Sequence, residues 1–76
     1  MSRRVYHVVW RQDRWHVRRV RAQRSSSCHL SKHHAIGRAV SYATVRGGLG
    51  QVVIHGKNGS VQREWTYGND PRSSVG

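Results

Sequence analysis

Arg4–Val20, which reads RVYHVVWRQDRWHVRRV, decides the fold of this chain. Arg4–Trp10 and Trp15–Val20 are rich in β-branched and aromatic residues, a composition typical of strands. The polar stretch Arg11–Arg14 between them is typical of a turn. A four-residue loop there predicts an antiparallel hairpin with Trp10 opposite Trp15, Val8 opposite Val17 and Tyr6 opposite Arg19.

The two faces of this predicted hairpin differ in character. Side chains alternate along a strand, so one face collects apolar residues and is the better core face: Tyr6, Val8, Trp10, Trp15 and Val17. The other face is mixed and basic, and it carries Val5, His7, Val9, His16, Arg18 and Val20. We expect that second face to lie against water or an anion.

A helix is expected in the middle of the chain. Ser31 is a suitable N-cap, because its hydroxyl can accept from a free backbone N–H. The apolar stripe that follows has helical spacing and predicts a helix from Lys32 to about Arg46: Ala35, Ile36, Ala39, Val40 and Ala43. Arg46 suits the negative end of the helix dipole, and Gly47-Gly48 would end the helix. The preceding segment, residues 21–30, is either a loop or a short extra strand ending near Leu30.

A second hairpin is predicted after the helix. Gln51–His55 and Ser60–Tyr67 flank a turn that contains Asn58-Gly59, a strong hairpin signal. The residues expected to share its apolar face are Val52, Ile54, Val61, Arg63, Trp65 and Tyr67. The predicted fold class is α+β: a small antiparallel sheet made of two hairpins (ββ-α-ββ, with or without a short strand before the helix) packed on one helix. We expect one domain over residues 4–71, between tails at 1–3 and 72–76.

Charge is the strongest indication of function. The 76 residues hold 14 Lys and Arg against three Asp and Glu, a formal net charge of +11. A charge of this size predicts polyanionic partners and says nothing about fold. The core of the expected phosphate-binding patch is Arg18, Arg19, Arg21 and Arg24, with Arg3, Arg4, Arg11, Arg14 and Lys57 flanking it and His7 and His16 on the open face as the next candidates. One alternative is a solvated basic surface that keeps the domain soluble, and another origin of the charge is a high-GC genome, whose codons favour arginine.

Other kinds of site have weaker support in the sequence. The chain has neither a CxxC nor a His-Glu-x-x-His motif, so we expect no metal or other cofactor. His33 and His34 fall on the first turn of the predicted helix, which could hold an anion. The few carboxylates form no acid–base pair, so we expect no catalytic residue. Cys28 is the one cysteine; we expect it to be half-buried and inert, and a lone cysteine favours a reducing, cytoplasmic location. No apolar run approaches the roughly 20 residues that cross a bilayer, so we expect no membrane segment.

The chain resembles the small bacterial and phage family catalogued as domain of unknown function 2188. The resemblance rests on Tyr6-His7-Val8-Val9, on Trp15 with Val17, on Val53-Ile54-His55-Gly56 with Asn58-Gly59, and on Tyr67-Gly68-Asn69-Asp70-Pro71. It covers the chain from Tyr6 to Pro71. The family has no settled activity, so the resemblance implies fold and origin alone.

The sequence therefore predicts a non-enzymatic nucleic-acid-binding module, with DNA favoured over RNA and with contacts mainly to phosphates. Three tryptophans could stack on bases, but Trp10, Trp15 and Trp65 all fall on predicted core faces. The alternative is a small inhibitor or adaptor that binds an acidic protein surface. An edge strand could also pair two copies into a homodimer.

Overall fold

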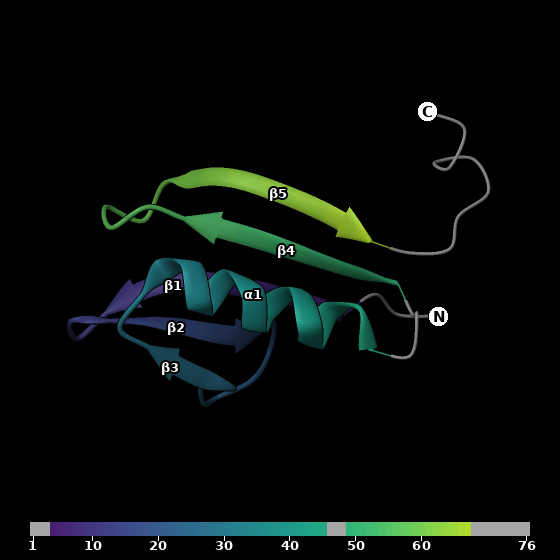
Figure 1. The fold of residues 1–76 in the computed structure, drawn as a ribbon, viewed down its shortest axis with the longest axis horizontal. Helices are drawn as coiled ribbons and strands as arrows, with labels where there is room; N and C mark the ends of the chain where they lie inside the picture. Colours follow the sequence, from purple (N-terminus) through teal and green to yellow (C-terminus); the bar gives the residue numbers. More distant parts are fainter. Residues whose placement is uncertain (1–3, 46–48, 68–76) are drawn as a thin grey trace.

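The computed structural model describes residues 4–45 and 49–67. Five strands and one helix follow one another as β1 (Arg4–Arg11), β2 (Arg14–Arg19), β3 (Ser27–His29), α1 (Lys32–Ala43), β4 (Gly50–His55) and β5 (Val61–Tyr67). The strands form one sheet in the order β3-β2-β1-β4-β5, and α1 lies across one face of it (Figure 1). The predicted α+β class, with two hairpins and one helix, is confirmed.

The first hairpin has the predicted register. Trp10 pairs with Trp15, Val8 with Val17 and Tyr6 with Arg19. The turn is tighter than expected, because Arg11 and Arg14 also pair and leave two residues between the strands. Those residues, Gln12 and Asp13, have φ of 50° and 61°. Positive φ at both central positions is what a type I′ turn requires, and such a turn matches the twist of the strands.

Residues 21–30 contain a short third strand, so the strand alternative is confirmed. β3 pairs with β2, placing Cys28 opposite His16 and His29 opposite Trp15. The expected N-cap is also confirmed, since the Ser31 hydroxyl accepts from the backbone N–H of His34.

The helix ends earlier than predicted, at Ala43 rather than near Arg46. Thr44 leaves helical geometry with φ −102° and ψ 7°, and both its N–H and its hydroxyl donate to the Val40 carbonyl. A threonine that satisfies a helix carbonyl with its own side chain competes with helix continuation. The expected roles of Arg46 and of Gly47-Gly48 lie outside the described residues.

The sheet is mixed, whereas an antiparallel sheet was expected. Each hairpin is antiparallel, but the hairpins join through β1 and β4, which run parallel, with Tyr6 opposite Val52 and Val8 opposite Ile54. The reason is the helical crossover. β3 runs parallel to β1, and α1 carries the chain back along the sheet before β4 begins, so β4 starts from the same end as β1.

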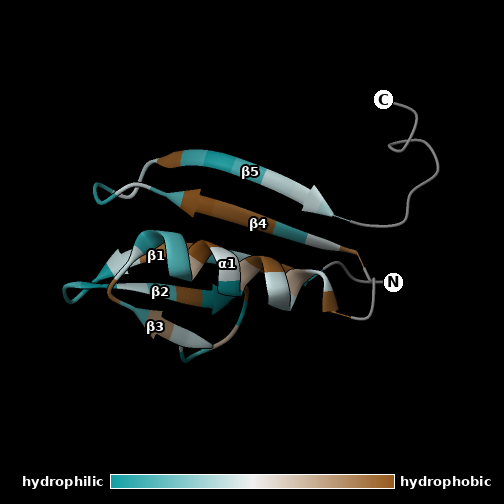
Figure 2. Ribbon diagram, viewed as in Figure 1, coloured by the Kyte–Doolittle hydropathy of each residue, from teal (hydrophilic) through white to brown (hydrophobic). Residues whose placement is uncertain are grey.

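The core lies between α1 and the sheet. Val8, Val17 and Val52 are fully buried, and Ala35, Ala39 and Ala43 form the buried stripe of the helix, as predicted. Small alanines let the helix approach the strands closely. Figure 2 shows the apolar character concentrated in β4 and along parts of β1, β2 and α1.

The tryptophans are on the core side of the sheet, as expected. Trp15 is buried, while Trp10 and Trp65 are half-buried against the core cluster. Val61 departs from the expected apolar face: it is 55% exposed. A register shift between Ile54 and His55 moves the start of β5 out of line with the core.

One end of the sheet collects three strand termini. Gly50 pairs with Arg4 on one side and with Tyr67 on the other. The predicted tails and the residues of the YGNDP motif after Tyr67 lie outside the described residues.

Candidate nucleic-acid interface

The face of the sheet that α1 leaves uncovered carries an open groove of about 380 Å³. It crosses the middle of the sheet, from β4 through β1 to β2 and the turn after β2. Nine residues line it: His7, Val9, Arg11, Arg18, Arg19, Val20, Arg21, Ala22 and His55. Five of the predicted phosphate-binding residues are therefore brought together: His7, Arg11, Arg18, Arg19 and Arg21.

The lining combines cationic and apolar residues. None of the nine lining residues is acidic, and four are arginines. Val9 and Ala22 are half-buried and Val20 is 46% exposed, so apolar surface lies among the guanidinium groups. Guanidinium keeps its charge at any physiological pH and can hold two oxygens of one phosphate, so this surface suits an anion.

Backbone contacts hold the turn at one side of the groove. Arg18 donates from Nη2 to the Ala22 carbonyl at 3.2 Å, and the Ala22 N–H donates to the Arg19 carbonyl at 3.0 Å. Arg21 has φ of 73°, a left-handed conformation. Arg18 thus spans the turn and fixes its own guanidinium beside the groove.

His7 and His55 form a close pair in the groove. His7 Nδ1 lies 2.8 Å from His55 Nε2, and the two rings stack with centroids 5.1 Å apart. His55 Nδ1 lies 3.0 Å from the Gly59 carbonyl. Burial lowers the pKa of His7 below 6.5, His55 lowers it further, and Glu64 acts in the opposite direction.

Other predicted site residues lie away from the groove. The Arg4 guanidinium donates to the Val45 carbonyl at 3.0 Å, just beyond the helix end. Arg14 is exposed at the start of β2, and Arg24 is exposed in the loop before β3. Lys57 places its ammonium 4.5 Å from the Trp10 ring centroid, on the helix side of the sheet. Arg3 lies outside the described residues.

His16 is on the uncovered face, as predicted, and contacts Cys28. Its Nε2 faces the Arg11 carbonyl at 3.1 Å, and its Nδ1 lies 2.8 Å from Ser25 Oγ and 3.2 Å from Cys28 Sγ. A carbonyl only accepts, so Nε2 carries the proton of the neutral ring and Nδ1 accepts. The expectation of a half-buried cysteine is wrong: Cys28 is exposed, because β3 is an edge strand.

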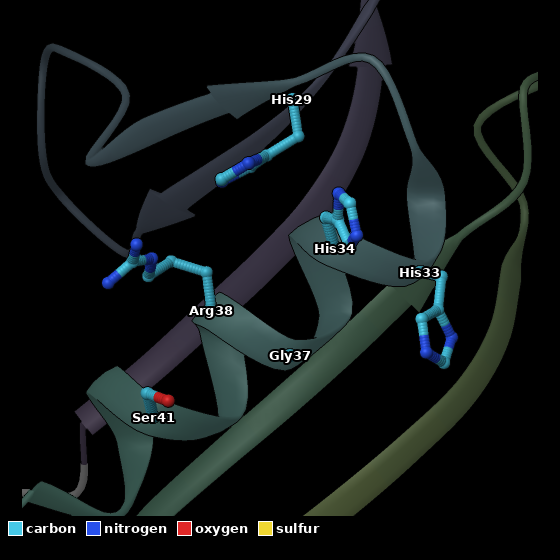
Figure 3. Close-up of a pocket in the computed structure, with 6 residues that line it drawn as sticks. All are labelled: His29, His33, His34, Gly37, Arg38 and Ser41. Carbon is cyan, nitrogen blue, oxygen red and sulfur yellow. The ribbon is translucent and has the colours of Figure 1, made fainter.

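A second groove, of about 450 Å³, lies between β3 and the exposed side of α1. His29, His33, His34, Gly37, Arg38 and Ser41 line it (Figure 3). Figure 3 shows the His33 ring on the other side of the first helical turn from His29. Over residues 4–45 and 49–67, no three His, Cys, Asp or Glu side chains are grouped as metal ligands. This groove holds fewer cations than the one on the uncovered face.

His55 is the groove residue that sequence reasoning missed. Its position opposite His7 depends on the parallel pairing of β1 with β4, which joins residues 48 positions apart. The available signal was the His55-Gly56-Lys57-Asn58-Gly59 turn, whose Gly59 has φ of 90° and whose carbonyl receives the His55 ring.

In the part of the chain that the structure describes, no helix is long and apolar enough to cross a membrane. No curated protein and no solved structure is significantly similar to the chain. Residues 6–67 match a family of bacterial proteins, DUF2188, described as uncharacterized proteins conserved in bacteria. The match spans both hairpins and the helix, and the chain therefore belongs to the DUF2188 family.

Proposed function

We propose that this protein is a non-enzymatic nucleic-acid-binding module that holds phosphates of the backbone in the groove on the uncovered face of its sheet. The observation that carries the proposal is the lining of that groove: four arginines, two histidines and no acidic residue around about 380 Å³. Arginine-rich surfaces without acidic side chains contact the phosphates of nucleic acids without reading the base sequence.

DNA is favoured over RNA because the tryptophan rings lie on the other face of the sheet and cannot stack on bases held in the groove. Recognition of unpaired bases uses exposed aromatic side chains as stacking platforms. Here Trp10, Trp15 and Trp65 are on the helix-covered face and pack against the core. The groove on the uncovered face is lined by no tryptophan or tyrosine, and its four arginines suit the backbone of a duplex. We place this activity in the cytoplasm.

The test is fluorescence anisotropy with labelled duplex DNA, single-stranded DNA and RNA, from about 50 to 300 mM salt. We expect duplex DNA to bind tightest, with affinity that falls steeply as salt increases. Each phosphate contact contributes about 0.9 to the slope of log K against log salt. No binding at 50 mM salt would overturn the proposal.

A matched pair of variants separates the groove from overall charge. Arg18→Glu with Arg21→Glu reverses two charges in the groove and should abolish binding. Arg38→Glu with Arg63→Glu makes the same change in net charge on exposed residues outside it, on α1 and β5. Equal losses in the two variants would show that net charge, and not the groove, binds DNA.

One observation favours a second candidate, a small inhibitor or adaptor that binds an acidic protein surface. Val9, Val20 and Ala22 are apolar and line the same groove as four arginines, and a protein-binding patch likewise combines apolar surface with charged residues. If no nucleic acid binds, capture of an acidic partner that fails with Arg18→Glu and Arg21→Glu would support this candidate.

β5 is an edge strand of seven residues, so we also propose sedimentation to test for a homodimer.

A further inference from the structure

The His7–His55 pair occupies one side of the groove and has an unusual hydrogen-bond arrangement. The Gly59 carbonyl can only accept, so His55 Nδ1, 3.0 Å away, carries a proton. One further proton lies between His55 Nε2 and His7 Nδ1, which are 2.8 Å apart. In the neutral pair, these two protons leave His7 Nε2 as a bare acceptor.

The pair can take up one proton without losing a contact. A proton added at His7 Nε2 leaves the bonds to His55 and to Gly59 unchanged. A second proton has no place, because the contact between the rings holds one hydrogen and would have to break. His7 Nε2 has no hydrogen-bond partner in the described part of the chain, so the added N–H is free to meet a ligand.

The groups around His7 determine the pH at which it binds that proton. Across from His7 lie Arg18 on β2 and Val53 on β4, with Glu64 of β5 opposite Val53. Arg11 and Arg21 add positive charge from the groove lining. Burial and His55 lower the pKa of His7, and Glu64 opposes them, with its carboxylate held by Gln51 at 2.7 Å. The imidazole of His7 is therefore mostly neutral at pH 7 in the free protein.

An anion in the groove reverses this balance. A phosphate held by the arginines brings negative charge to His7 and accepts the N–H that protonation creates. From this geometry we propose that the His7–His55 pair is a proton-coupled phosphate receptor: phosphate in the groove is bound together with one proton on the pair. The inference rests on the proposed function, and it adds the residues and the pH dependence of binding.

Proton coupling has a defined thermodynamic signature. Uptake of one proton makes affinity rise as the pH falls, by up to tenfold per pH unit between the pKa of the free and of the bound pair. We expect duplex DNA to bind about tenfold more tightly at pH 5.5 than at pH 7.5. Calorimetry in buffers of different ionisation enthalpy should find close to one proton taken up at pH 6.5.

The control must remove the general effect of charging histidines. His7→Gln with His55→Gln removes the pair, and His33→Gln with His34→Gln removes two exposed histidines on α1, away from the groove. We expect the first variant to lose the pH dependence and the second to retain it. If the first variant does not fold, the histidine ring signals of the wild-type protein decide: the pair should gain its proton at higher pH when inorganic phosphate is added.

Comparing duplex DNA with inorganic phosphate as ligands distinguishes the proton-coupled phosphate receptor from the proposed nucleic-acid binding. Duplex binding with the same pH dependence in the wild-type protein and in His7→Gln with His55→Gln would overturn the receptor and leave the proposed function intact. Proton-linked binding of inorganic phosphate without binding of duplex DNA would support the receptor and overturn the proposed function. Binding of neither ligand would overturn both.

Discussion

Two glycine-to-alanine substitutions should change stability in opposite directions. Gly50 begins β4 beneath the end of α1, and a Cβ placed there would lie 2.1 Å from the Ala43 carbonyl oxygen and 2.8 Å from its carbon. Real Cβ contacts do not fall below 3.0 Å, so the strand and the helix end must separate by about 0.9 Å (3.0 minus 2.1). Gly37 lies mid-helix, and a Cβ there would meet nothing within 4 Å.

The magnitudes follow from these surroundings. Overpacking costs about 1–3 kcal/mol, and the Gly50 contact is with backbone, so we expect about 3 kcal/mol. A domain of this size has about 3–5 kcal/mol in total, so Gly50→Ala should lose most of its stability. Gly37→Ala removes a glycine from a helix interior and should add about 0.5–1 kcal/mol.

Urea unfolding followed by tryptophan fluorescence measures both changes. With a slope of about 1 kcal/mol/M, Gly50→Ala should lower the midpoint by about 3 M, and Gly37→Ala should raise it by about 0.5–1 M. A Gly50→Ala protein as stable as the wild type would refute the close approach of α1 to β4. A destabilised Gly37→Ala protein would refute the open space beside the helix.

Three further predictions concern the turn, the cysteine and the histidine pair. Asp13→Gly should raise the free energy of unfolding by about 0.5–1 kcal/mol, measured by urea unfolding, because glycine adopts the φ of 61° without the roughly 1–2 kcal/mol that left-handed geometry costs other residues, while its greater backbone entropy offsets about half of that gain. Cys28 should react with a thiol reagent in the folded protein with a stoichiometry of one, whereas a buried thiol would react only after unfolding. Stability should fall as the pH drops below 6.5: the lowered pKa of His7 means that the unfolded chain gains its proton first, so the stability present above 6.5 is lost toward the folded pKa. This loss should be smaller in His7→Gln, and an unchanged pH profile in that variant would contradict the lowered pKa.

Local patterns in the sequence predict each hairpin but not how the hairpins meet. The pairing of Trp10 with Trp15 follows from alternation and a short turn, which act within 17 residues. The pairing of Val8 with Ile54 depends on how far α1 carries the chain along the sheet, and no local pattern records that distance. The same holds for the candidate site: arginines from one hairpin were predicted, while His55 comes from the other.

Exposure was harder to predict at the edges of the sheet than in its centre. Central residues such as Val8 and Val52 have neighbours on both sides, so apolar character alone places them. Cys28 and Val61 lie on the two edge strands, where the length of the strand and a register shift decide what is covered. These are properties of the assembled sheet.

The register at Gly50 also determines where the chain could be circularly permuted. Arg4 and Tyr67 flank Gly50 on neighbouring strands, so they lie two strand spacings apart, about 10 Å. A linker of about four residues spans that distance. A circular permutant that joins residue 67 to residue 4 and opens the chain between Gln12 and Asp13 would keep every strand pairing. In such a chain β1 would follow β5 in sequence. The parallel pair β4 and β1 would then be separated in sequence only by β5 and the linker, and no longer by β2, β3 and α1.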